Sequence, residues 1–140
     1  MMLPDVNVLI YAVNASSPQH AAAKAWIEQS LSSSESVAFA WVAVLGFIRL
    51  STLKVVMKPP LTVGHALELV NNWLSHPLAQ IVHPTAQHEA ILARLFLGAG
   101  TAGNLTTDAH LAALAIEHRA TLVTFDRDFE RFAGLKVKYL

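Results

Sequence analysis

Short apolar runs alternate along this chain with longer segments in which apolar residues recur every three or four positions. The runs at 2–6, 37–40, 79–82, 121–125 and 136–140 predict strands, of which the first is buried at the centre of the sheet and the last lies at its edge. The periodic segments at 7–13, 18–29, 41–49, 62–73, 84–96 and 104–119 predict helices. Strands that alternate with helices indicate an α/β fold, a three-layer αβα sandwich with a mainly parallel sheet of about five strands.

Helix boundaries follow from capping residues. Ser17 is expected to cap a helix whose first residue is Pro18, and Thr62 to cap the helix after the Pro59-Pro60 stop. The segment 98–103 matches G-x-G-x-x-G, but the residues before it have helical periodicity. Because a dinucleotide fingerprint needs a strand directly before its first glycine, this segment is interpreted as a helix C-cap followed by a turn.

Composition limits the class of protein. The 140 residues are expected to form a single domain, 1–140, with 54% hydrophobic and 14% charged residues. So few charged residues indicate that some apolar surface is exposed and available to a partner protein. Alanine-rich helices would be an alternative explanation of the high hydrophobic fraction. A net charge of zero argues against a general basic nucleic-acid binder. The lack of cysteine excludes disulfides and makes a cytoplasmic location the simplest expectation. The longest apolar run, 37–48, is too short to span a membrane.

The chain has four aspartates, and their positions suggest one site. Asp5 and Asp126 fall at carboxyl ends of predicted strands, Asp128 follows in the same turn, and Asp108 falls in the first turn of a helix. Ligands of parallel sheets bind at that edge, and repulsion between clustered carboxylates is relieved by a hard cation such as Mg²⁺ or Mn²⁺. The alternative is that each aspartate has only a local structural role. Asp108 would then stabilise the N-terminus of its helix, and Asp126 and Asp128 would form the turn after a strand.

Other polar residues could support such a site. Asn7 could hydrogen-bond a water or a carboxylate, and the Thr124 hydroxyl could orient a water or one carboxylate. A β-branched residue placed only to suit its strand is the simpler explanation of Thr124. Arg49 and Arg127 are candidate contacts for phosphates, against the commoner role of solvated or ion-paired side chains.

Four segments, in this order and spacing, resemble the motifs of the PIN domain, and the resemblance is closest to the VapC toxins of bacterial type II toxin–antitoxin pairs. They are residues 5–11, 41–50, 104–112 and 124–129. The resemblance implies a Mg²⁺- or Mn²⁺-dependent ribonuclease that cuts RNA with a metal-activated water. It also implies a homodimer and a cognate antitoxin that blocks the site.

The resemblance also implies residue roles. Asp5, Asp108 and Asp126 match the metal-ligand positions, Asp128 matches a supporting or occasional ligand, and Asn104 opens the third motif. The chain departs from the pattern in one place.

Many PIN domains carry a glutamate three residues before the arginine that matches Arg49, and here that residue is Gly46. The four aspartates can still hold one cation. A second cation is less expected, because Gly46 cannot supply the missing carboxylate.

Two alternative functions follow from these departures. Gly46 and the neutral charge suit a catalytically weakened PIN-fold module that binds RNA or protein. The segment 5–9 approaches the D-x-D-x-[TV] opening of haloacid-dehalogenase-like phosphatases, in which the first aspartate is the nucleophile. Asn7 stands where that mechanism wants an acid, which makes the phosphatase the weaker alternative.

Overall fold

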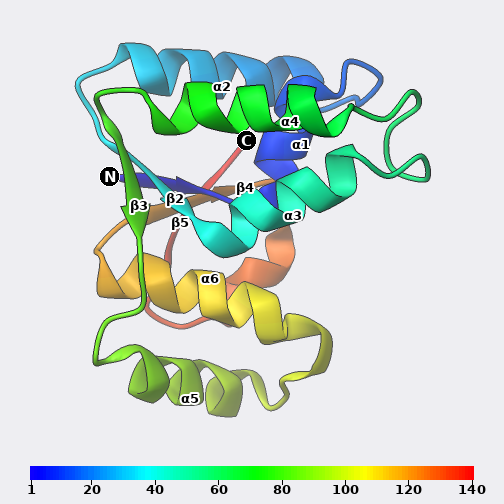
Figure 1. Cartoon of the computed structure of the whole chain (residues 1–140). Helices are drawn as coiled ribbons and strands as arrows, with labels where there is room; N and C mark the ends of the chain where they lie inside the picture. Colours follow the sequence, from blue (N-terminus) through cyan, green and yellow to red (C-terminus); the bar gives the residue numbers. More distant parts are fainter.

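A five-stranded parallel sheet forms the centre of the molecule. A computed structural model describes residues 1–140, and Figure 1 shows the sheet between two groups of helices. The strand order is β3–β2–β1–β4–β5, and every neighbouring pair is parallel. The strands are β1 (Met2–Pro4), β2 (Val37–Ala40), β3 (Ala79–Val82), β4 (Thr121–Thr124) and β5 (Lys136–Tyr139). The predicted α/β sandwich is therefore confirmed.

The helices cover both faces of the sheet. Helices α1 to α4 lie on one face, and α5 and α6 lie on the other (Figure 1). The helices are α1 (Val6–Val13), α2 (His20–Ser32), α3 (Trp41–Ser51), α4 (Val63–Leu74), α5 (His88–Ala99) and α6 (Thr106–Glu117), with 3₁₀ turns η1 (Gly103–Leu105) and η2 (Arg127–Arg131). A separate buried apolar cluster fills each face, which is the layered arrangement expected for this pattern. None of these helices combines the length and apolarity that crossing a bilayer requires.

Two of the expected helix ends are confirmed. The Thr62 hydroxyl accepts a hydrogen bond from the His65 amide at 3.1 Å and caps α4. Gly100 ends α5 in the left-handed conformation, with φ of 76°. The glycine-rich segment is thus a C-cap and turn, as its preceding helical pattern indicated.

Two expected helix starts were too early. Helix α2 begins at His20, because the Ser17 hydroxyl accepts from the Gln19 amide and closes a turn ahead of the helix. Helix α5 begins at His88, because the Thr85 amide and hydroxyl donate to Glu117 at 2.9 and 2.6 Å. In both places a polar side chain binds a backbone or carboxylate group outside the helix, which competes with helix formation.

The Glu117 carboxylate also links α5 to α6. The Glu117 side chain has no exposed surface and accepts a 2.5 Å hydrogen bond from His88 Nδ1. The other ring nitrogen of His88 is hydrogen-bonded to His110 Nδ1 at 2.9 Å. These two histidines therefore belong to a polar network between two helices.

The strand order reverses direction between β1 and β4, at the centre of the sheet. The chain runs outward from β1 through β2 to β3, and then returns to place β4 on the other side of β1. Between β1 and β4 the connecting helices therefore diverge to opposite faces of the sheet. Open α/β sheets bind their ligands at such a point, beyond the carboxyl ends of the strands.

Candidate active site

Asp5 is the first residue beyond β1. Pro4 has no N–H, and the ladder continues through the Asp5 amide, which donates to the Val123 carbonyl at 2.9 Å. The residue is only 4% exposed, and α1 begins directly after it. Asp5 occupies the N-cap position of α1, yet its side chain forms no capping hydrogen bond. The carboxylate is therefore left to interact elsewhere.

Thr124 holds this carboxylate. Its hydroxyl donates to Asp5 Oδ2 at 3.0 Å and accepts from the Asp126 amide at 3.0 Å. Thr124 is fully buried at the end of β4. The hydroxyl thus links the ends of β1 and β4, which is more than a β-branched residue placed only to suit its strand would do.

Asp126 and Asp128 belong to the turn after β4. Asp126 Oδ1 accepts from the Asp128 amide at 2.8 Å and caps η2, so the local role expected for a turn aspartate is real. Asp128 is exposed, and its Oδ1 lies 3.9 Å from Arg131 Nη2. Asp126 keeps further acceptor capacity, because a carboxylate offers about four lone-pair positions.

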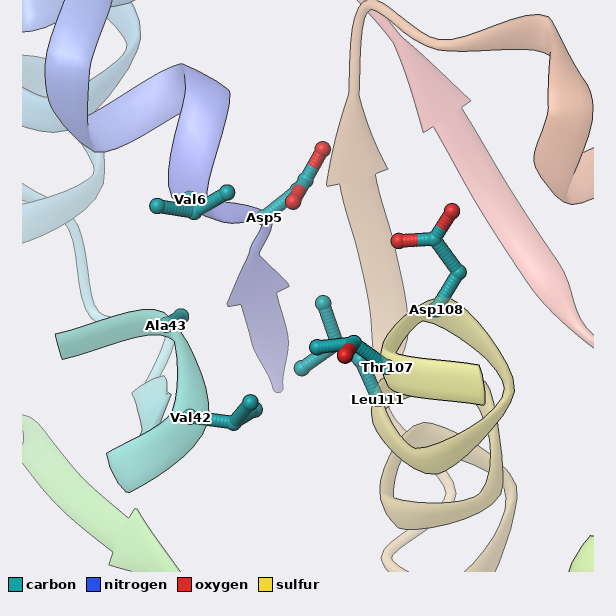
Figure 2. Close-up of a pocket in the computed structure, with 7 residues that line it drawn as sticks. All are labelled: Asp5, Val6, Val42, Ala43, Thr107, Asp108 and Leu111. Carbon is teal, nitrogen blue, oxygen red and sulfur yellow. The ribbon is translucent and has the colours of Figure 1, made fainter. Parts of the chain in front are cut away.

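Asp108 approaches from the opposite layer. It lies in the first turn of α6, and its carboxyl group points into the same space as that of Asp5 (Figure 2). A cavity of about 30 Å³ lies between them, which is room for roughly one or two waters. The cavity is lined by Asp5, Val6, Val42, Ala43, Thr107, Asp108 and Leu111. Its polar side is thus formed by carboxylates, and the side formed by α3 is apolar.

Burial and mutual repulsion raise the pKa of two carboxyls. Burial is the main reason that the pKa of Asp5 lies above its usual range. The Thr124 hydroxyl and the Val6 and Asn7 amides oppose this rise, and Asp126 adds to it. The pKa of Asp108 rises to about 6, first through burial and then through Asp5, Asp126 and Asp128. All four aspartates are therefore close enough to influence one another electrostatically.

The aspartates do not form a closed set of ligands. No three carboxylate, histidine or cysteine side chains converge tightly enough to define a metal site by themselves. No lysine or arginine pairs with Asp5 or Asp108 either. This donor set suits Mg²⁺, which is commonly held by one or two carboxylates and keeps several of its waters.

The remaining predicted site residues are more peripheral. Asn7 is half-buried in the first turn of α1 and takes no part in the Thr124 network. Asn104 is exposed in η1, and Arg49 is exposed in the last turn of α3. Arg127 is exposed immediately after Asp126 and forms an ion pair with Glu130 at 3.2 Å.

Sequence reasoning missed the apolar part of the site. Val42, Ala43 and Leu111 line the cavity, and their apolar character resembles that of any core residue. Thr107 also lines it, and its position beside Asp108 in the third motif was the available signal. Tyr139 was missed as well, although its β5 position pairs in register with Thr124.

Gly46 has a structural explanation. A Cβ atom at this position would lie 2.9 Å from Val6 Cγ2, closer than real Cβ atoms pack. Val6 in turn lines the cavity beside Asp5. The absence of a side chain at Gly46 therefore lets α3 approach α1 where many PIN domains place a glutamate.

A second cavity, of about 220 Å³, lies at the other end of the sheet. It is formed near the amino ends of β4 and β5 by Ala115, Ile116, Arg119, Ala120, Gly134 and Lys136. It is larger than the cavity at Asp5 but has no carboxylate in its lining. The chemistry described above therefore belongs to the smaller cavity.

Comparisons with known proteins agree with this arrangement. Residues 2–135 match the PIN domain family. Ribonuclease VapC37 of Mycobacterium tuberculosis is 46% identical over 136 residues, which cover 97% of this chain and 94% of that protein. VapBC2 of Rickettsia felis, solved bound to promoter DNA, has a TM-score of 0.73 at 19% identity, with coverage of 99% and 97%. VapC20 of Mycobacterium tuberculosis, described as a sarcin-ricin loop cleaving toxin, has a TM-score of 0.66 at 17% identity, with coverage of 97% and 99%.

The chain therefore belongs to the PIN domain family. Within that family it is a member of the VapC ribonucleases. This membership sets aside the haloacid-dehalogenase-like phosphatase, whose opening motif the segment 5–9 only approached.

Proposed function

We propose that this protein is a metal-dependent endoribonuclease toxin that hydrolyses RNA phosphodiester bonds. The observation that supports it best is the buried Asp5 carboxylate, which is hydrogen-bonded by Thr124 but has no basic partner. A charge so placed is costly, and a cation is the simplest group that would offset its burial. Asp108 and Asp126 are the carboxylates that would share that cation.

Asp5, Asp108 and Asp126 would hold Mg²⁺, with Mn²⁺ as a substitute, and Asp128 would assist from the turn. The bound ion would polarise the scissile phosphodiester and increase the acidity of an attacking water. Mg²⁺ prefers hard oxygen ligands, and these side chains supply nothing else. Burial and the neighbouring aspartates raise the pKa of Asp108 to about 6, and a bound cation would lower it.

The residues of the chain contribute position and exclusion of water. Thr124 fixes Oδ2 of Asp5, and no other side chain binds this carboxylate, which can therefore still accept a ligand. Val42 and Leu111 close the side of the cavity opposite the carboxylates, which lowers the local dielectric and strengthens charge interactions there. Asn7 and Asn104 would orient waters or substrate from the rim, and Arg49 and Arg127 would contact RNA phosphates.

The direct test is cleavage of RNA by the purified protein with and without Mn²⁺. We expect cleavage that depends on the ion and is lost in Asp5→Asn, which keeps size and removes charge. Glu28→Gln serves as the control, because Glu28 is an exposed acid on α2, paired only with Lys24. Cleavage that survives both EDTA and Asp5→Asn would contradict the proposal.

A non-catalytic PIN module that binds RNA or protein is the second candidate. The close contact of Gly46 with Val6 favours it, because α3 contains no acid and a side chain at position 46 would not fit without repacking. Calorimetry separates the two functions. Binding of Mn²⁺ that Asp5→Asn abolishes supports the nuclease, and absence of binding supports the module.

The apolar surface supports protein partners. Large apolar side chains are exposed at the same spacing on two neighbouring helices, Trp41 and Leu45 on α3 and Val63 and Leu67 on α4. Exposed apolar area of this kind is typical of interfaces. The partners proposed here are a second copy of the chain and a cognate antitoxin that blocks the site. The proposed RNA substrate is consistent with the cytoplasmic location expected from the sequence, because RNA is abundant in the cytoplasm.

Co-expression tests the antitoxin. The protein alone should arrest growth, and the product of the adjacent upstream gene should restore it. Light scattering of the purified protein tests the homodimer, and Leu45→Glu with Leu67→Glu should shift a dimer towards monomer. Arrest that Asp5→Asn leaves unchanged would argue against toxicity through RNA cleavage.

A further inference from the structure

The guanidinium of Arg127 lies over an aromatic ring near the carboxylates. Its guanidinium carbon is 3.9 Å from the centre of the Tyr139 ring. Tyr139 is the last residue of β5 and pairs in register with Thr124, the residue that binds Asp5. Arg127 itself follows Asp126 directly in the chain. The pair therefore stands at the edge of the candidate active site, one strand away from its centre.

Contact with the ring leaves most donors of Arg127 available. A guanidinium carries five N–H donors, and the contact of its central carbon with the ring uses none of them in a hydrogen bond to a polar acceptor. One nitrogen, Nη1, donates to Glu130 at 3.2 Å, and the side chain is 70% exposed. Most of its donors therefore face solvent, in the planar geometry that matches a phosphate group.

Arg127 does not pair with the neighbouring aspartates. An arginine next to Asp126 and Asp128 could pair with either carboxylate and partly neutralise the site. Tyr139 and Glu130 are the partners that Arg127 has instead. Asp5, Asp108 and Asp126 therefore have no basic partner, and the charge of Arg127 remains available to an anion.

The Tyr139 hydroxyl does not explain why the side chain lies there. It is buried and has no hydrogen-bond partner within the chain. A buried hydroxyl without a partner is unfavourable, so the ring is the part of this side chain that contributes to the arrangement.

We propose that Tyr139 is a positioning residue, which holds the Arg127 guanidinium where it binds a phosphate of the RNA next to the scissile bond. The inference rests on the proposed nuclease function. It deepens that function by assigning a phosphate contact to a chain that has no general basic surface. Arg127 touches the substrate, and Tyr139 acts through Arg127.

Binding and cleavage are measured separately. Affinity is measured in the Asp5→Asn background, by fluorescence anisotropy of a short labelled single-stranded RNA of mixed sequence over a range of salt concentrations. Arg127→Ala should weaken binding about three- to tenfold and lower the salt slope by about 0.7, the value for one lost phosphate contact. Tyr139→Leu should have the same effect, and the double variant should be no weaker than either single variant.

The conservative variant distinguishes positioning from a structural role. Tyr139→Phe keeps the ring and should restore the affinity and salt slope lost in Tyr139→Leu. In the active enzyme, Tyr139→Leu should raise KM by the same factor and leave kcat within about twofold. A destabilised fold would lower kcat and the melting temperature together, and it would not change the salt slope by one phosphate.

Lys138→Ala is the matched control, because Lys138 is an exposed cation in the same strand. It should change neither affinity nor salt slope, and an effect equal to that of Arg127→Ala would overturn the proposal in favour of general electrostatics. Additive losses in the double variant would also overturn it. Normal RNA cleavage with unchanged binding in Tyr139→Leu would reject this inference and leave the nuclease intact. If neither the wild type nor any variant cleaves RNA, the proposed function fails. The binding experiment would still show whether Tyr139 positions Arg127 for a phosphate contact.

Discussion

The Thr124 hydroxyl donates a hydrogen bond to Asp5 Oδ2, at 3.0 Å, between residues separated by 119 positions in the chain. No other side-chain hydrogen bond joins the ends of β1 and β4. The same hydroxyl accepts from the Asp126 amide, so one buried atom sets the relative positions of two proposed metal ligands. Groups that orient ligands in this way commonly contribute as much to activity as the ligands themselves.

Replacing Thr124 by valine keeps the shape and removes the hydroxyl. We expect Thr124→Val to lower Mn²⁺ affinity and RNA cleavage by about 10- to 100-fold, because Asp5 loses its fixed orientation. Thr124→Ser retains the hydroxyl and should stay close to wild type. Calorimetry gives the affinity. A loss in the serine variant without a loss in the valine variant would show that the methyl group, rather than the hydroxyl, is what matters.

Asp108 makes the metal-free protein sensitive to pH. Its folded pKa, about 6, lies above the usual value of 3.8, so the folded state binds this proton more tightly than the unfolded state. Its contribution to stability is therefore fully present below pH 3.8 and is lost as the pH rises through about 6. In EDTA at neutral pH, Asp108→Asn should raise the free energy of unfolding by about 1–2 kcal/mol.

Urea titrations at several pH values measure that difference. The gain in Asp108→Asn should shrink as the pH falls from 7 towards 4, because the wild-type carboxyl then becomes neutral as well. Adding Mn²⁺ should reverse the order of stability at neutral pH, since only the wild type has the Asp108 carboxylate that would bind the ion. A gain that does not vary with pH would contradict the electrostatic explanation.

Glu117 has the opposite pH dependence. Burial tends to raise its pKa, but hydrogen bonds from His88 and Thr85 outweigh burial and hold the pKa below its usual value of 4.5. Its contribution to stability is therefore present above pH 4.5 and is lost as the pH falls through the lower folded pKa. Glu117→Gln should destabilise the fold by about 1–3 kcal/mol at pH 7. The substitution replaces one acceptor oxygen by an amide NH₂ group, which would face the N–H and O–H donors of His88 and Thr85.

Thermal unfolding of Glu117→Gln checks this, and the difference from wild type should narrow at low pH. Leu97→Gln is a suitable control, because Leu97 is exposed on the same helix as His88 and touches none of this network. A variant as stable as wild type at pH 7 would mean that the network contributes nothing to holding α5 on α6.

A methyl group at Gly46 should destabilise the protein although alanine favours helices. The new Cβ would lie 2.9 Å from Val6 Cγ2, and such overpacking costs about 1–3 kcal/mol, more than the gain of about 1 kcal/mol in helix propensity. In a Val6→Ala background the nearest atom of residue 6 is its Cβ, 3.6 Å away, and Gly46→Ala should become neutral or stabilising. Chemical denaturation of the four proteins in this cycle gives the coupling, and its absence would reject the steric explanation.

The sequence predicted the strands, their parallel arrangement and the positions of Asp5 and Asp126 just beyond strand ends, because hydrophobic periodicity and strand ends are local properties. Helix starts were less accurate, since Ser17 and Thr85 have bonding partners that the capping rules do not consider. The contact of Gly46 with Val6 could not be predicted, because it depends on the distance between two helices. The stacking of Arg127 on Tyr139 likewise requires the register of β4 against β5.

The order of synthesis has a consequence for a nuclease built in this way. Thr124 and β4 follow Asp5 and β1 in the chain, and Asp5 and Thr124 are separated by 119 positions. Neither β1 nor Asp5 therefore has its β4 partner until more than a hundred further residues have been made. A nascent chain that has not reached β4 lacks Thr124 and Asp126, so its candidate active site is incomplete. The proposed cleavage of RNA can therefore begin only after β4 has been added.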